Sequence, residues 1–101
     1  MTETVYSKNA VSIRLTDERW GHITEEHGEL TGLRSEILAT VANPTWIFAG
    51  HQGELLAVRE IEPGKYLAVV YREFQNDGFI ITAFLTRRLH ALQRRQQLWP
   101  L

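Results

Sequence analysis

The chain has 101 residues, of which 44% are hydrophobic and 23% are charged, and it contains no cysteine. This length and composition correspond to one small globular domain. The lack of cysteine excludes disulfide bonds and thiolate catalysis, and no apolar run approaches the ~20 residues that cross a bilayer. The first residues carry neither the basic start nor the apolar stretch of a signal peptide. We therefore expect one cytoplasmic domain without metal or cofactor, with its core at residues 11–88 and a C-terminal helix or tail at residues 89–101.

The formal net charge of −1 hides an asymmetry along the chain. Residues 1–78 hold all twelve acidic residues against seven basic ones, a balance of −5. Residues 79–101 hold four arginines and no acidic residue: Arg87, Arg88, Arg94 and Arg95. A basic end on an acidic domain indicates an anionic partner, or docking onto an acidic helix of the same or a second subunit. A solvated basic helix is the simpler alternative.

The first third of the chain predicts a strand followed by an amphipathic helix. Apolar and polar residues alternate over Val11–Leu15, which is typical of a short strand. Thr16 has the properties of a helix N-cap, and the two acidic residues after it suit the first turn. The expected helix runs from Asp17 to about His27, and Gly28 is expected to end it as a C-cap. The residues expected to face inward are spaced i, i+3, i+7: Trp20, Ile23 and His27.

A second helix is expected over residues 33–42. It ends at Asn43-Pro44, because the residue before a proline avoids the helical conformation. From Thr45 onward the hydrophobic period becomes two and turn signals recur, which predicts strands joined by short turns. The expected strands are residues 46–49, 54–61, 65–74 and 79–85. Short turns join antiparallel neighbours, so these strands form a four-stranded antiparallel meander.

The end of the chain predicts a basic helix. Thr86 is its candidate N-cap, and three leucines align on one side: Leu85, Leu89 and Leu92. Arg87 and Arg88 would lie in its first turn, where the helix dipole disfavours cations, which suggests a role other than stabilising the helix. The predicted fold is therefore α+β, with two N-terminal helices packed on a four-stranded antiparallel meander and a C-terminal basic helix.

Two histidines in the first expected helix are the most informative candidates for chemistry. Imidazoles exchange protons near neutral pH, which suits acid–base catalysis. Helical zinc sites place two histidines at i and i+4, whereas His22 and His27 are at i and i+5, about 140° apart at ~100° per residue. This spacing excludes that type of metal site. His27 falls on the apolar stripe, where a hydrogen-bonded core histidine is the alternative to a site residue. His51 and His90 are expected at the surface.

Three short segments carry a resemblance to a known group of proteins. They are the Trp20, His22 and Ile23 segment with His27-Gly28-Glu29-Leu30, the Asn43-Pro44 pair, and Ile81-Thr82-Ala83-Phe84. In these segments the chain resembles phage and mobile-element members of the barnase, EndoU, colicin and RelE group of small RNases and toxins. The resemblance covers roughly residues 11–88. The chain differs at Glu26 and Gly28, where members of the group often carry a basic residue and a proline.

The resemblance implies metal-independent RNA cleavage, in which the 2′-hydroxyl attacks its own phosphate. This reaction needs a base for the hydroxyl, an acid for the leaving oxygen and cations beside the phosphate. The positions that match the group are His22, His27 and Thr82. Residue chemistry alone adds Arg59 and Tyr71 as candidate catalytic groups, with Arg87 and Arg88 as candidate phosphate-binding groups. An antitoxin or immunity protein is the partner that the resemblance implies.

Each of these candidates also has a structural alternative. Thr82 is a good strand former, Tyr71 suits the core, and Arg59 suits a salt bridge to a helix glutamate. If Phe74 pairs with Phe79, then Tyr71 and Thr82 share a face of the sheet and Arg59 lies on the other, and a one-residue slip reverses this. The sequence pI of about 6.4 and the lack of an exposed basic-aromatic run argue against tight RNA binding.

A second hypothesis is a non-catalytic module on the same scaffold that binds a protein or itself. The leucine stripe of the last expected helix and Trp99-Pro100-Leu101 are its candidate interface, which predicts a homodimer through residues 85–101. The RNase hypothesis instead predicts that His22, Thr82 and either Arg59 or Arg87 converge on one concave surface.

Overall fold

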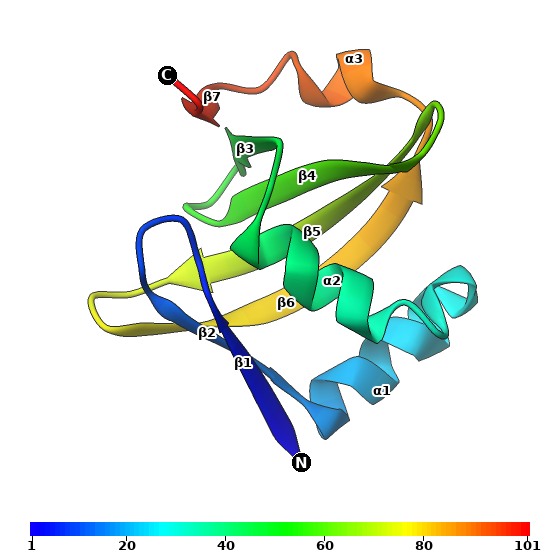
Figure 1. Cartoon of the computed structure of the whole chain (residues 1–101), viewed down its shortest axis with the longest axis vertical. Coiled ribbons are helices and arrows are strands. Elements are labelled where there is room, and N and C mark those ends of the chain that lie inside the picture. The colour runs from blue at the N-terminus through cyan, green and yellow to red at the C-terminus, as the bar shows by residue number, and fades with distance from the viewer.

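The computed structural model describes residues 1–101 and shows an α+β protein built on one seven-stranded sheet (Figure 1). The strands are β1 (Thr2–Tyr6), β2 (Ser12–Thr16), β3 (Trp46–Ala49), β4 (Leu55–Glu62), β5 (Lys65–Glu73), β6 (Asp77–Thr86) and β7 (Gln97–Trp99). The helices are α1 (Asp17–Glu26), the 3₁₀ turn η1 (Gly28–Leu30), α2 (Arg34–Ala42) and α3 (Leu89–Leu92). The strand order is β1-β2-β6-β5-β4-β3-β7, and β2 is parallel to β6 while all other neighbours are antiparallel.

The predicted architecture is wrong, although its parts are present. The four expected strands exist as β3 to β6, but they form the middle of a larger mixed sheet. The N-terminus adds the hairpin β1–β2, which the sequence hid because β1 is largely exposed and lacks an apolar alternation. The expected C-terminal basic helix is a single turn, Leu89–Leu92, because β6 continues through Thr86, and the segment after the turn adds β7 beside β3.

The sheet curves around α2, which packs against strands from separate parts of it. Helix α2 contacts β1 as well as β4 and β5, and Figure 1 shows it lying across one face of the sheet. The main core lies under α1 and α2 and contains fourteen buried residues. A smaller cluster on the opposite face contains Phe48, Leu56, Val58, Ala68 and Leu92, with Leu89 packed against it. The two leucines of the last turn therefore stabilise the chain's own core rather than form a free stripe.

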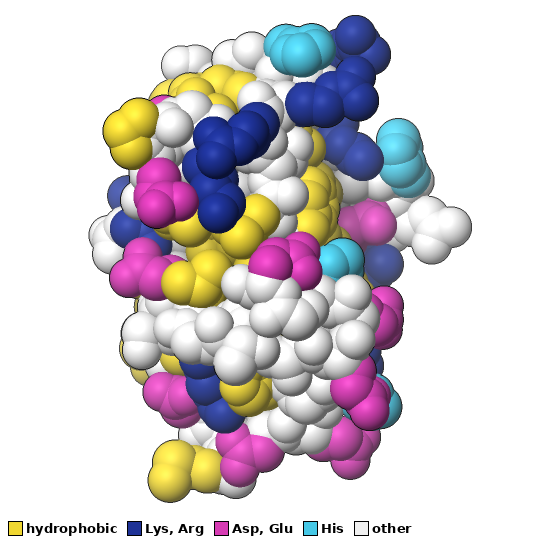
Figure 2. Space-filling view, turned by 90° about the vertical axis from the view of Figure 1, so that its right-hand side faces the viewer, with side chains coloured by type: hydrophobic (Ala, Val, Ile, Leu, Met, Phe, Trp, Pro, Cys, Tyr) yellow, Lys and Arg dark blue, Asp and Glu magenta, His cyan; other side chains and the backbone are white.

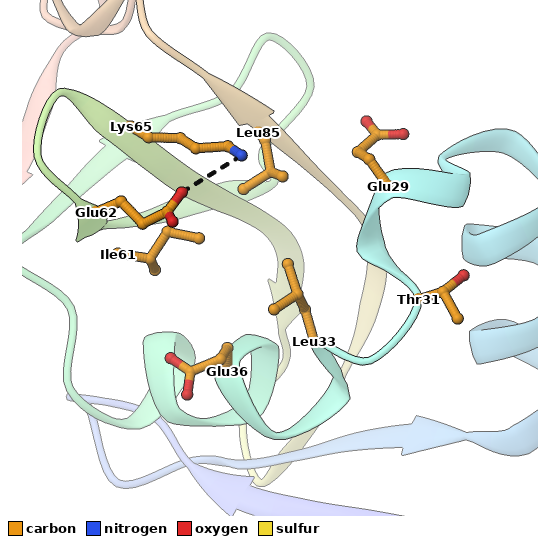
Figure 3. Close-up of a pocket in the computed structure, with 8 residues that line it drawn as sticks. All are labelled: Glu29, Thr31, Leu33, Glu36, Ile61, Glu62, Lys65 and Leu85. Carbon is orange, nitrogen blue, oxygen red and sulfur yellow. Dashed lines mark ion pairs between the residues drawn. The ribbon is translucent and has the colours of Figure 1, made fainter.

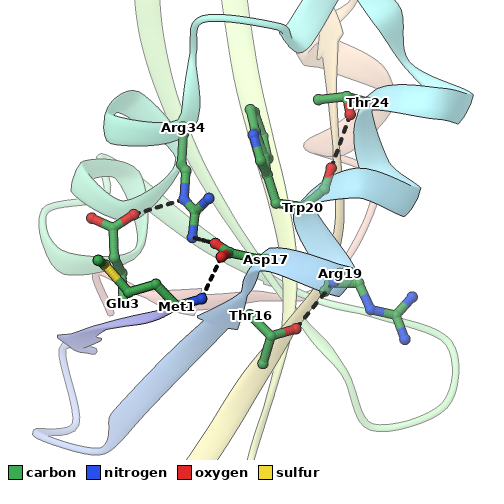
Figure 4. A network of polar contacts seen from close by, with 8 residues as sticks. All are labelled: Met1, Glu3, Thr16, Asp17, Arg19, Trp20, Thr24 and Arg34. Carbon is green, nitrogen blue, oxygen red and sulfur yellow. Dashed lines mark hydrogen bonds and ion pairs between the residues drawn. The ribbon is translucent and has the colours of Figure 1, made fainter.

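Helix α1 is held in place at its first turn. The side chain of Thr16 accepts a hydrogen bond from the Arg19 backbone N–H at 3.1 Å, as expected for an N-cap. Arg34 of α2 pairs with Glu3 of β1 at 2.6 Å and with Asp17 at 2.9 Å (Figure 4). The amino group of Met1 also contacts the Asp17 carboxylate. The hydrogen bonds from the N-terminal amine and from Arg34 hold the pKa of Asp17 below its usual value.

One edge of β6 is left without a strand partner over most of its length. Strand β2 pairs only with Asp77, Gly78 and Phe79. Beyond this point, α1 and η1 pack beside β6 on that side. The interface between α1 and the edge of β6 is where the candidate site lies.

A β-bulge in β6 determines which side chains reach this edge. Val70 pairs with Thr82 and Tyr71 pairs with Ile80, so Ile81 is the extra residue. Ile80 and Ala83, three residues apart, are both buried in the main core. The two residues between them, Ile81 and Thr82, are only half-buried.

The β4–β5 register and the bulge in β6 together set the relation between the candidate residues. Arg59 pairs with Leu67, which places it on the same face as Tyr71, whereas Thr82 lies opposite Val70 on the other side of the strand. The expectation that Tyr71 and Thr82 share a face, with Arg59 on the other, was conditional on a pairing that the sheet does not contain. It rested on pairing Phe74 with Phe79, but Phe79 pairs with Arg72.

Candidate functional site

A cavity of about 250 Å³ lies between α1 and the free edge of β6. It is lined by five residues of α1 and its C-cap and two of the β6 bulge: Arg19, His22, Ile23, Glu26, His27, Ile81 and Thr82. Both histidines and the threonine singled out in the sequence therefore line one hollow. Their neighbours Arg19 and Glu26 add a guanidinium and a carboxylate to the same wall.

The two histidines reach one cavity because His27 has left the helix. Arg19, His22 and Glu26 follow the i, i+3, i+7 spacing of one helical face. His27 is the C-cap residue, with φ of −133° and ψ of 74°, so the rotation of 100° per residue no longer applies to it. Its side chain is 33% exposed, which makes the expected core role wrong. The predicted C-cap, Gly28, instead begins η1.

A carboxylate lies near one ring nitrogen of each histidine. The Nδ1 atom of His22 is 3.9 Å from Glu25 Oε2, and the Nδ1 atom of His27 is 3.6 Å from Glu29 Oε2. In each ring the Nδ1 side is therefore the one that faces a carboxylate.

Arg19 supplies the cavity with a cation that no carboxylate neutralises. Its guanidinium makes no ion pair within 4 Å, unlike Arg34 on the same part of the fold. Figure 4 shows the Arg19 side chain leaving α1 on the side away from Arg34. Sequence reasoning missed Arg19, although its i−3 position relative to His22 is a signal that could have identified it.

Two of the predicted catalytic residues lie outside this cavity. Arg59 bonds to α2, with Nη2 at 2.7 Å from Glu36 Oε2 and Nε at 3.2 Å from Thr40 Oγ1. This is the salt bridge to a helix glutamate that the sequence left as the alternative. Tyr71 is fully buried, and its hydroxyl has no hydrogen-bond partner. Burial, with a smaller contribution from Glu73, raises the pKa of Tyr71 far above its usual value. It cannot reach a ligand at the edge of β6.

The two arginines predicted to bind phosphate lie further along β6. Arg87 lines a separate hollow of about 280 Å³ with Glu29, Lys65, Leu85 and Thr86. Arg88 is exposed, and neither arginine makes an ion pair. Figure 2 shows Lys and Arg side chains gathered in the upper part of this side of the molecule, toward α3, with most Asp and Glu side chains below. Neither Arg87 nor Arg88 therefore lines the cavity that holds the histidines.

The largest hollow of the molecule has a different chemistry. It measures about 480 Å³, lies between α2, η1 and the β4–β5 hairpin, and is shown in Figure 3. Its polar residues include Glu29, Glu36 and Glu62 with only one cation, Lys65, which pairs with Glu62 at 3.5 Å. An acidic wall repels polyanions. We therefore place the candidate site in the smaller cavity, which holds the imidazoles.

The comparisons with known proteins add no assignment. No family model, curated protein or solved structure matches this chain. No cluster of three or more His, Cys, Asp or Glu side chains is arranged to hold a metal ion. None of the helices has the length and apolar character needed to span a membrane.

Proposed function

We propose that this protein is a metal-independent endoribonuclease whose active site is the cavity between α1 and β6. The observation that supports this function is that His22, His27 and Thr82 line one cavity together with the unpaired Arg19. The residues that the resemblance to the barnase, EndoU, colicin and RelE group selects are among those that line it. The proposed location is the cytoplasm, where RNA is abundant.

The reaction assigns a role to each group in the cavity. One imidazole removes the proton of the 2′-hydroxyl, whose oxygen attacks the adjacent phosphorus. The other imidazole protonates the 5′-oxygen as the bond from phosphorus to that oxygen breaks. The products are a 2′,3′-cyclic phosphate and a 5′-hydroxyl. Arg19 balances the charge that develops on the phosphate oxygens, and the Thr82 hydroxyl donates a hydrogen bond to one of them.

Glu26 is a position at which this chain differs from the proposed group, whose members often carry a basic residue there. Glu26 stands on the same helical face as Arg19 and His22 and lines the same wall. A carboxylate there opposes phosphate binding unless the adjacent cation compensates it. We propose that Glu26 opposes the approach of the phosphate rather than contacts it, so Glu26→Gln is expected to strengthen RNA binding.

The direct test is cleavage of single-stranded RNA by the purified protein in the presence of a metal chelator. Each of His22→Ala and His27→Ala is expected to lower the cleavage rate by ~10²- to 10⁴-fold, the usual contribution of a general acid or base. His51→Ala and His90→Ala are matched controls, because both histidines are exposed and lie outside the cavity. These two variants are expected to cleave at the wild-type rate.

The same assay examines the phosphate contacts. Thr82→Val keeps the shape of the side chain and removes the hydroxyl, and it is expected to cost as much as ~10²-fold in kcat. Lack of a 2′,3′-cyclic phosphate product, or equal activity of His22→Ala and His51→Ala, would show that the cavity is not an RNase active site.

A further inference from the structure

A second hollow continues the candidate active site along the edge of β6. It has a volume of about 170 Å³ and lies where β2 ends and α1 begins. Its lining residues are Arg14, Thr16, Arg19, Phe79 and Ile80. Arg19 lines both this hollow and the cavity of the two histidines. A molecule bound in either hollow would therefore lie next to the Arg19 guanidinium.

Two phenylalanine side chains lie at the β2 end of the site and do not belong to the hydrophobic core. Phe74 is 55% exposed and Phe79 is half-buried, and neither belongs to the two hydrophobic clusters. Their ring centroids are 6.0 Å apart with an angle of 34° between the planes. An exposed pair of aromatic rings in a small protein is a common mark of a binding surface.

Cations flank these rings on the side of the hollow. The guanidinium carbon of Arg14 is 5.9 Å from the centroid of the Phe79 ring. An ion pair of 2.8 Å between Arg14 Nη1 and Asp77 Oδ2 holds that guanidinium in place. Arg19 on the other wall is unpaired. The fold thus assembles a basic-aromatic surface from β2, α1, the β5–β6 turn and the start of β6, although the sequence contains no such run.

We propose that Phe79, supported by Phe74 and Arg14, is a stacking subsite for a nucleobase next to the scissile phosphate of single-stranded RNA. Surfaces that bind single strands combine a cationic path for the backbone with aromatic side chains on which bases stack. Phe79 is three residues from Thr82 along β6, and because the bulge at Ile81 lies between them, their Cα atoms are at most roughly 10 Å apart at ~3.3 Å per residue. This separation suits a base whose sugar adjoins the phosphate at Thr82. The subsite rests on the proposed RNase function and specifies its substrate as unpaired RNA.

The test measures RNA binding in a His22→Ala background, so that the RNA stays intact. The probes are a fluorescently labelled single-stranded RNA of mixed sequence and the same strand with abasic nucleotides, each followed by anisotropy. Phe79→Leu is expected to weaken binding of the normal strand by roughly 5- to 150-fold, the range of a base–aromatic stack. Phe79→Trp restores the affinity, because it restores an aromatic face. The abasic strand is bound weakly and to the same extent by all three proteins.

Two further variants test the second ring of the pair and a general effect of exposed aromatic side chains. Phe74→Leu changes the more exposed ring and is expected to weaken binding in the same direction as Phe79→Leu. Tyr6→Leu removes an aromatic ring that is 69% exposed on β1 and does not line the hollow, and it is expected to leave the affinity unchanged.

The outcomes separate this proposal from the proposed function. If the wild-type protein cleaves RNA but Phe79→Leu and Phe74→Leu bind it with unchanged affinity, the subsite is refuted and the RNase stands. If the wild-type protein cleaves no RNA, but Phe79→Leu weakens binding of the normal strand and not of the abasic strand, the RNase proposal fails and the stacking subsite stands.

Discussion

Alanine substitutions at Gly78 and Gly21 make the same chemical change, and we expect them to alter stability in opposite directions. Gly78 is buried in β6 at the point where β2 and β5 pair with it from either side. Gly21 lies in the middle of α1 on its exposed side. The pair therefore tests whether β5 and β2 pack closely around Gly78 as described.

The magnitudes follow from what an added methyl group would meet. At Gly78 it would lie 2.1 Å from the backbone oxygen of Arg72 and 2.7 Å from Ile13 Cδ1. The backbone atom cannot withdraw without opening the β5–β6 ladder, so Gly78→Ala is expected to cost about 3 kcal/mol or more. At Gly21 no atom lies within 4 Å. Alanine there replaces a poor helix former, and Gly21→Ala is expected to gain ~0.5–1 kcal/mol.

Urea unfolding followed by circular dichroism measures both effects. With a slope of ~1–3 kcal/mol per molar urea, Gly78→Ala is expected to lower the midpoint by about 1–3 M. Gly21→Ala is expected to raise it by a few tenths of a molar unit. A Gly78→Ala protein with an unchanged midpoint would refute the close approach of the three strands. A destabilised Gly21→Ala protein would refute the placement of that residue in an open helix interior.

Three further changes probe residues whose roles the structure reassigns. Arg59→Met removes the bonds to α2 and is expected to cost about 1–2 kcal/mol in urea unfolding while leaving RNA cleavage unchanged; a large loss of cleavage without a loss of stability would contradict this. Tyr71→Phe removes a buried hydroxyl without a partner, so the variant is expected to be as stable as the wild type or up to ~1 kcal/mol more stable. The pKa of Asp17 is lower in the folded state than in the unfolded chain, so the ionised carboxylate stabilises the fold at neutral pH. This contribution is lost as the pH falls below about 4, because the unfolded chain binds the proton at a higher pH than the folded one. The fall in unfolding midpoint between pH 7 and pH 3 is therefore expected to be smaller for Asp17→Asn than for the wild type, and an equal fall would contradict the role of this carboxylate.

Local signals predicted the elements whose boundaries depend on nearby residues. The N-cap Thr16 and the Asn43-Pro44 pair set the start of α1 and the end of α2, because capping bonds and the proline restriction act within a few residues. The recurring turns separated β3 to β6 correctly. Strands β1 and β7 escaped notice because β1 is mostly exposed and β7 has only three residues, and neighbouring strands rather than their own periodicity stabilise them.

The candidate site could be predicted only in part. The two histidines and Thr82 were selected from the sequence, and all three line one cavity. The helical phase then separated His22 from His27, which is wrong because the helix ends one residue before His27. Arg59 was selected on its charge alone, and its partner on α2 is visible only after folding.

The sequence by itself determined the α+β composition, the N-cap of α1 and the end of α2, the central strands and the residue types that can exchange protons or bind phosphate. These depend on interactions between residues close in the chain. The tertiary structure decided the parallel contact of β2 with β6, the bulge at Ile81 and the meeting of α1 with the free edge of β6. A one-residue difference in strand register turns a side chain to the other face, and no local pattern records it. For that reason only the folded chain shows that Thr82 lies beside the histidines and Tyr71 does not.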